Sequence, residues 1–232
     1  ASEVIDDALG WVQETGLDSP VYLWLHLYDA HYPHQAPKQY TDLLPGQPYD
    51  AEIAYVDDQV QRVVDAFGDA PTLFVVVGDH GESLGEHGEN GHGFFVYDST
   101  QRVPWFMAGP GVPINVVDTP VSLVDVMPTV LDTLGLPIPA SVDGRVAPHN
   151  QPVYMEAFML QDRLGLAPHF GLVKGNEKLI DVPRPELYRL DADPNEQSDV
   201  AADQMDSVVS LKQTIDGFGF APRDPSAALS LD

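Results

Sequence analysis

The residues best suited to chemistry lie in the segment TLFVVVGDHGESLGEHGENGHGFF, which starts at Thr72. Its short apolar run, residues 73–77, is rich in β-branched residues and predicts one buried strand. Asp79 and His80 follow this run almost at once, and His92 comes after a stretch with many glycines and acids. Glycine lets the backbone approach a ligand closely, and carboxylates and imidazoles bind divalent metals or contact anionic esters. We therefore expect a ligand site where this strand ends.

A second apolar run, residues 21–27, ends in the polar segment YDAHYPH, which contains His31. The arrangement repeats the first one, because polar groups again follow an apolar run that reads as a buried strand. A third strand is expected at 103–107. The spacing of apolar residues predicts helices at 3–15, 50–67 and 121–134.

The segment GDHGESLGEHGENGHGFFVYDSTQRVPWFMAGPGV resembles the signature segment of the sulfatases, within the alkaline-phosphatase-like superfamily. Weaker matches to the same family are WLHLYDAHYPH, YDAEIAYVDDQV, VSLVDVMPTVLDTLGL and ELYRLDADPNEQSDVA. Together they cover almost the whole chain, but they resemble only the C-terminal part of such an enzyme.

The resemblance implies an α/β fold with a mostly parallel sheet flanked by helices, as in alkaline phosphatase. Residues 1–150 would then form the C-terminal portion of the sulfatase catalytic domain. From residue 153 the pattern changes to short apolar runs separated by Gly, Pro and Asn, which predicts a small antiparallel sheet over 153–191. With a last helix at 204–218, residues 151–232 would form a small subdomain.

The resemblance also implies roles for individual residues. Asp79 and His80 match the family's metal ligands, and His31 matches the histidine that contacts the ester anion. His92 occupies the position where many sulfatases place a lysine beside the ester. We therefore assign His31 and His92 to substrate binding and catalysis, with His92 as a candidate for protonating the leaving oxygen. The expected cofactor is one divalent cation, Ca²⁺, Mn²⁺ or Zn²⁺, and His80 favours the softer ions.

The nucleophile expected of a sulfatase is absent from this sequence. The chain has no cysteine, and no serine lies in the S-x-P-x-R motif that the family uses. The family's N-terminal acidic metal ligands have no match either, so the metal site is expected to be incomplete in this chain.

Two classes of function stay open. One is the C-terminal part of a metal-dependent sulfatase, or of a phosphonate or phosphodiester hydrolase or phosphotransferase of the same superfamily. The other is a non-catalytic, sulfatase-like module that binds an anion.

The net charge of the chain limits the classes of partner that it can bind. Its 36 acids against 11 Lys and Arg give a net charge of −25, which argues against binding nucleic acid or an anionic membrane. No apolar run approaches the roughly 18 residues of a membrane span, and no signal peptide is visible. The expected partners are a sulfate ester of a small molecule or glycan and the missing N-terminal half of the same protein. We also expect an exposed apolar surface that promotes self-association. The resemblance favours a periplasmic or extracellular location.

Overall fold

The computed structural model describes residues 1–219. The chain forms two compact units, residues 1–76 with 106–110, and residues 77–105 with the part that begins at residue 111. The predicted boundary at residue 150 stays a prediction, and the predicted subdomain 151–232 extends beyond the described residues. None of the helices within residues 1–219 is long and apolar enough to cross a membrane.

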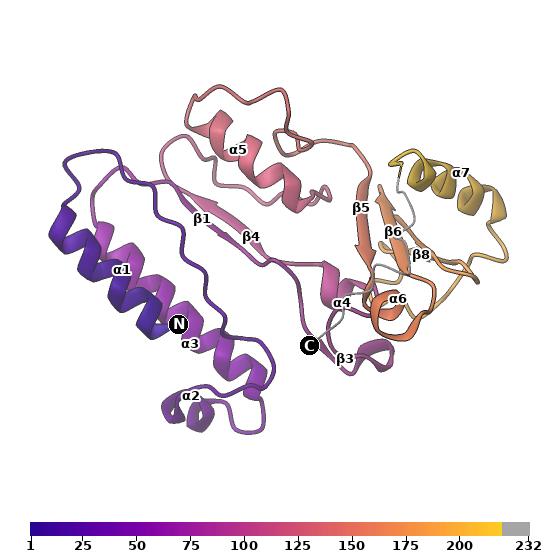
Figure 1. The fold of residues 1–232 in the computed structure, drawn as a ribbon, viewed down its shortest axis with the longest axis horizontal. Coiled ribbons are helices and arrows are strands. Elements are labelled where there is room, and N and C mark those ends of the chain that lie inside the picture. Colours follow the sequence, from indigo (N-terminus) through magenta and orange to yellow (C-terminus); the bar gives the residue numbers. More distant parts are fainter. Residues whose placement is uncertain (220–232) are drawn as a thin grey trace. The chain divides into compact units, whose positions relative to one another are not determined.

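The first unit is built on a pair of helices, α1 (Ser2–Thr15) and α3 (Pro48–Phe67), with the short α2 (Lys38–Leu43) beside α3 (Figure 1). Both long helices were predicted from the sequence, and both are confirmed. Each ends at a glycine with positive φ, Gly16 at 73° and Gly68 at 49°, a backbone region that other residues rarely adopt. Their shared core contains the buried side chains Ile5, Val12, Val63 and Phe67.

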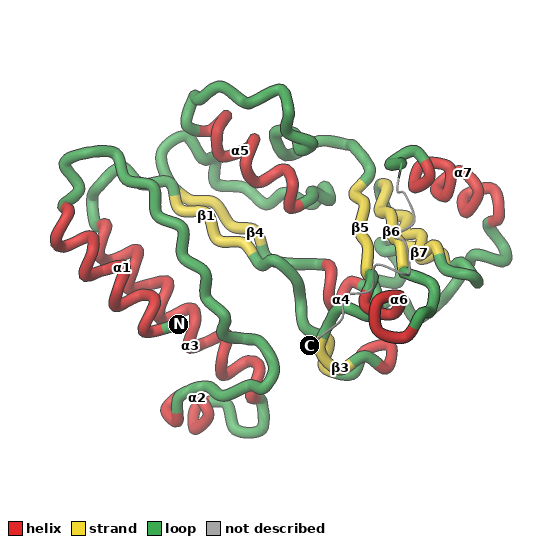
Figure 2. Tube along the Cα trace, viewed as in Figure 1, coloured by secondary structure: helices red, strands yellow, loops and turns green. Residues whose placement is uncertain are grey.

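The predicted strand at residues 21–27 is wrong. These residues are extended, but they form no strand in the part of the chain that the structure describes (Figure 2). Leu23 and Leu25 pack on the α1–α3 core, whereas Tyr22 is 86% exposed and Trp24 is 79% exposed. The alternation of apolar residues therefore correctly indicated an extended segment with one buried side. A strand additionally needs a hydrogen-bonded neighbour, which apolar periodicity cannot supply.

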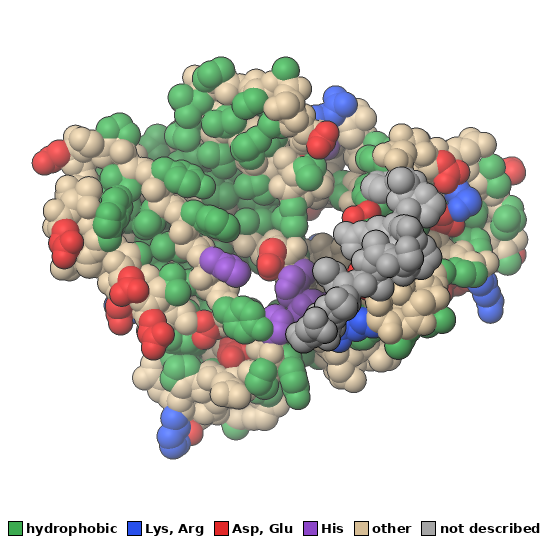
Figure 3. Space-filling view, in the orientation of Figure 1, with side chains coloured by type: hydrophobic (Ala, Val, Ile, Leu, Met, Phe, Trp, Pro, Cys, Tyr) green, Lys and Arg blue, Asp and Glu red, His purple; other side chains and the backbone are tan. Residues whose placement is uncertain are grey.

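The mostly parallel sheet flanked by helices is also wrong. Strands β1 (Phe74–Val77) and β4 (Trp105–Ala108) match two predicted strands, but together they make only a two-stranded sheet. The other sheets in residues 1–219 have two and four strands, and their pairings are antiparallel. With so few strands, a sheet face stays open, and Val76 and Val77 are each 39% exposed. Large apolar side chains are accordingly visible on the surface, as expected from the sequence (Figure 3).

The second unit contains the predicted antiparallel sheet, which is confirmed. Strands β5 (Val153–Ala157), β6 (His169–Lys174), β7 (Glu177–Asp181) and β8 (Glu186–Arg189) follow one another in chain order. Gly175, with φ of 60°, makes the two-residue turn between β6 and β7 possible. The predicted last helix is α7 (Met205–Asp216), and its apolar side chains pack on one face of the sheet. This core contains Leu172, Leu179, Leu187, Val208, Leu211 and Ile215.

The remaining helices, turns and strands of the second unit are short. The helix predicted at 121–134 appears as a 3₁₀ turn, η2 (Leu123–Asp125), that leads into α5 (Val126–Thr133). The glycine-rich segment contains β2 (Ser83–Leu84), the 3₁₀ turn η1 (Glu86–Gly88) and β3 (Asn90–Gly91). Two one- to two-turn helices complete the unit, α4 (Asp98–Gln101) and α6 (Met159–Leu164).

Candidate active site

The glycine-rich segment folds back on itself as a small hairpin. Ser83 pairs with Gly91 across β2 and β3, and the Ser83 hydroxyl donates a hydrogen bond to the Glu89 carbonyl oxygen at 3.0 Å. Gly85 and Gly91 have φ of 120° and 95°, so both ends of the loop need a residue without a Cβ. The hairpin returns the chain to its starting point, which brings residue 92 next to residue 80.

His80 and His92 are stacked, with ring centroids 3.8 Å apart and planes inclined by 30°. The Nδ1 atom of His80 lies 2.8 Å from the carbonyl oxygen of Gly81 and donates to it, so the lone pair of a neutral ring is on Nε2. His92 Nδ1 lies 3.6 Å from Oε1 of Glu82, whose side chain is only 4% exposed.

Asp79 projects its carboxylate into solvent from the end of β1, with 78% of its side chain exposed. Its Oδ1 accepts the backbone N–H of His80 at 3.0 Å and lies 3.9 Å from His80 Nε2. One carboxylate oxygen and one imidazole nitrogen thus face the same space. This donor set suits Mn²⁺ or Zn²⁺ better than Ca²⁺, which prefers oxygen ligands alone. Two donors are fewer than the three protein ligands usual for a catalytic metal.

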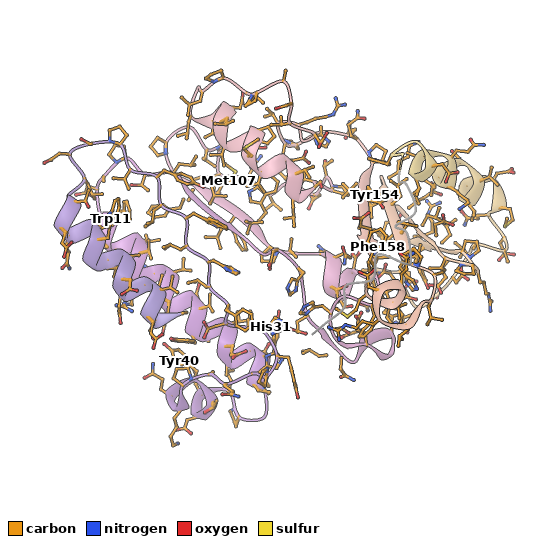
Figure 4. The ribbon with its side chains drawn as sticks, in the orientation of Figure 1. Trp11, His31, Tyr40, Met107, Tyr154 and Phe158 are labelled. Atoms are coloured by element: carbon orange, nitrogen blue, oxygen red, sulfur yellow. The ribbon has the colours of Figure 1, made fainter. Side chains whose placement is uncertain are left out.

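These three residues line an open pocket of about 500 Å³ within the second unit. The rest of its lining comes largely from the end of β5 and from α6, with Phe158 directly before the helix (Figure 4). The α6 helix fits closely against the hairpin, since a Cβ on Gly93 would stand 2.7 Å from Cε of Met159. The lining residues of this part are Glu156, Ala157, Phe158, Met159, Asp162 and Arg163.

A buried ion-pair network connects α4, which follows the glycine-rich segment, to the antiparallel sheet. The Lys178 side chain is fully buried, and its Nζ lies 2.6 Å from Asp98 Oδ1 and 2.7 Å from Glu196 Oε1. Glu196 also accepts the backbone N–H of Asp98 at 2.7 Å. Burial raises the pKa of Glu196, and Lys178 opposes this rise. The network therefore fixes the start of α4 to β7.

The α4 helix in turn holds the residues next to His80. The Gly81 N–H donates to the carbonyl oxygen of Thr100 at 2.7 Å. A Cβ on Gly81 would stand 2.4 Å from the carbonyl oxygen of Ser99, so only glycine allows this approach. Because the His80 imidazole donates to the Gly81 carbonyl, the position of α4 also sets the orientation of that ring.

The comparisons with known proteins decide the family. The sulfatase family profile matches residues 2–136, which is more than half of the chain. The chain belongs to the sulfatase family. It is 26% identical over 249 residues to arylsulfatase K of Rattus norvegicus, a match that covers 92% of this chain and 44% of that protein.

Solved structures show the same relationship at the level of the fold. The crystal structure of Ps i-CgsB in complex with k-i-k-neocarrahexaose matches with a TM-score of 0.79 at 21% identity, over 97% of this chain and 56% of that one. Phosphonate monoester hydrolase SpPMH from Silicibacter pomeroyi matches with a TM-score of 0.61 at 25% identity, over 81% and 43%. The chain thus spans about half the length of these proteins.

The structure brings Asp79, His80 and His92 together on one pocket, as the signature segment indicated. His31 belongs to the first unit, where its ring stacks on Tyr28 with centroids 4.6 Å apart. Its Nδ1 lies 2.6 Å from the carbonyl oxygen of Tyr32, so a neutral ring carries its lone pair on Nε2.

Sequence reasoning missed the contribution of α6 and of Lys178. The α6 residues lie in a segment between two strands that showed no helical periodicity long enough to be recognised. Lys178 left only a weak signal, because β7 has the sequence EKLID and contains two further charged residues, Glu177 and Asp181. The structure shows which of the three is buried, and a lysine is rarely buried without an acidic partner.

Proposed function

We propose that this chain is the C-terminal part of a metal-dependent sulfatase that hydrolyses sulfate esters. The observation that carries the proposal is the convergence of Asp79, His80 and His92 on one pocket in a chain of the sulfatase family. Asp79 and His80 would hold a divalent cation, which neutralises the negative oxygens of the ester when bound. The remaining ligands and the nucleophile would come from the missing N-terminal half of the same protein.

His92 is proposed to bind the substrate and to protonate the leaving oxygen. Its Nδ1 faces the buried carboxylate of Glu82 at 3.6 Å. In that arrangement Nε2 is the nitrogen that gives its proton to the leaving group and lets the alcohol depart neutral. His31 is proposed, from the family pattern alone, to contact the ester anion. The substrate class is a sulfate ester of a small molecule or glycan.

A second candidate function is hydrolysis of phosphonate esters, and the likeness to a phosphonate monoester hydrolase favours it. Sulfate and phosphonate monoesters share tetrahedral geometry and negative oxygens, so the same residues could serve both. Assays with 4-nitrophenyl sulfate and 4-nitrophenyl phenylphosphonate separate the two functions, because each releases the same coloured product.

The test joins this chain to an N-terminal half that carries the nucleophile motif and measures 4-nitrophenyl sulfate hydrolysis. We expect activity that requires a divalent metal, and no turnover by residues 1–232 alone. Asp79→Ala should abolish metal-dependent activity. His92→Ala should lower kcat by about 10²–10⁴-fold and alter the alkaline limb of the pH profile, since the general acid is lost.

The matched control is His26→Ala, because His26 is an exposed histidine that does not line the pocket. It should leave the rate unchanged. Calorimetric titration of residues 1–232 with Mn²⁺ and Ca²⁺ should show weak binding at most. Tight metal binding or hydrolysis by this chain alone would mean that its site is complete and that its ligands are other residues.

A further inference from the structure

The α6 helix presents one side to the pocket, and that side contains Met159 and Arg163. The two residues are four positions apart, so they lie on the same face of the helix, one turn after the other. Met159 packs closely on Gly93, the residue that follows His92. Arg163 therefore sits one helical turn beyond the contact that joins α6 to the His92 loop, and it lines the pocket.

Arg163 is distinctive because it is a cation that lines the pocket and is not paired with an acid in the described residues. Of the ten Lys and Arg within residues 1–219, it alone lines this pocket. Within that part of the chain it forms no ion pair, whereas Lys38, Arg62, Lys178, Arg189 and Lys212 all do. A guanidinium is always charged and offers donors in a fork that matches carboxylates and sulfates.

The other charged groups of the same wall are acids. Glu156 and Asp162 both line the pocket, and Glu156 accepts a hydrogen bond from the Tyr154 hydroxyl at 2.7 Å. An anionic group of a ligand would be repelled by these carboxylates wherever it lay close to them. Arg163 is thus the one place on this wall where a second negative charge is favoured.

The size of the pocket indicates that a ligand reaches beyond the ester group. At about 500 Å³ it lies within the range of pockets that enclose a small organic ligand, and it is much larger than one sulfate group. His80 and His92 come from the hairpin side of the pocket, and Arg163 comes from α6. A ligand held at the histidines has room to extend to the helix.

We propose that Arg163 determines specificity by binding a second anionic group of the substrate, a sulfate or carboxylate separate from the ester that reacts. The proposal rests on the proposed function for the placement of the reacting ester at the histidines. On this proposal, α6 discriminates between substrates with two anionic groups and substrates with only the reacting ester.

The test measures binding of two probes to residues 1–232 by NMR titration or calorimetry. Methyl glucoside 6-sulfate carries one anionic group, and methyl glucoside 2,6-disulfate carries two. We expect the wild-type chain to bind the disulfate at least tenfold more tightly, as one charged hydrogen-bonded contact provides. Arg163→Gln should remove this preference and leave the affinity for the monosulfate unchanged. Arg163→Lys should keep part of the preference, since it retains the charge but not the fork.

Arg184→Gln is the control, because Arg184 is an exposed arginine that forms no ion pair within residues 1–219 and does not line the pocket. It changes the net charge equally and should keep the preference. Equal weakening of both probes by Arg163→Gln overturns the proposal, as does an unchanged preference. Failure of both probes to bind the wild-type chain overturns it too. The proposed function is judged separately by the hydrolysis assay and by His92→Ala, which should weaken both probes alike.

Discussion

Replacing Lys178 by methionine should destabilise the second unit strongly. Lys178 is fully buried and lies within 2.7 Å of two carboxylates, those of Asp98 and Glu196. Methionine keeps most of the volume but removes the charge, so two acids are left facing each other without a cation. Breaking a buried ion pair by removing one partner costs about 3–5 kcal/mol in the free energy of unfolding. For a chain of this size that corresponds to a fall in Tm of roughly 6–20 °C.

The loss should depend on pH in a defined direction. Burial already raises the pKa of Glu196, and without Lys178 only the hydrogen bond from the Asp98 backbone N–H opposes that rise. A carboxyl group whose folded-state pKa is raised contributes stability that is present at low pH and is lost as the pH rises through that value. The variant should therefore approach the wild type in stability as the pH falls towards 4. Adding Glu196→Gln should recover part of the loss at pH 7, because it removes one of the two uncompensated charges.

Thermal denaturation measures the loss of stability, and hydrogen exchange of the β6 and β7 amides shows whether the loss lies in the sheet that contains Lys178. Lys212→Met is the matched control, since Lys212 pairs with Asp181 at a half-exposed position. Such a pair contributes about 0–1 kcal/mol, so the control should unfold near the wild-type temperature. A Lys178→Met chain that unfolds at the wild-type temperature at pH 7 would refute the reasoning. In that case the buried network would contribute nothing that methionine cannot replace.

Two further predictions concern the loop that carries His92. Gly93→Ala should lower the free energy of unfolding by about 1–3 kcal/mol, because Met159 must move and φ is 99°. Gly88→Ala has a similar φ of 79° but open space around it, so urea denaturation should show a smaller loss, and an equal loss would contradict the packing argument. Glu89→Gln should raise the free energy of unfolding at pH 7, because burial raises the pKa of the Glu89 carboxyl and the charged form is disfavoured in the folded state. The gain should vanish below about pH 4, where the unfolded carboxyl is protonated too, and a gain that persists there would exclude ionisation as its cause.

The sequence by itself determined the family and much of the local structure. The signature segment carried Asp79, His80 and His92 at fixed spacings, and its glycines indicated a loop whose backbone needs conformations closed to other residues. Helices α1 and α3 and the C-terminal antiparallel sheet followed from apolar periodicity, because each buries one face of a regular element. These features depend on residues close together in the chain.

The tertiary structure decided what depends on distant partners. Whether residues 21–27 form a strand depends on a neighbour that supplies hydrogen bonds, and their own alternation of apolar side chains cannot show whether that neighbour exists. The contact of α6 with Gly93, and hence the place of Arg163 on the pocket, joins residues some 70 positions apart. The same holds for Lys178, whose charge is tolerated only because Asp98 and Glu196 come from two other parts of the chain. Local sequence specifies which groups can do chemistry, and long-range packing specifies which of them meet.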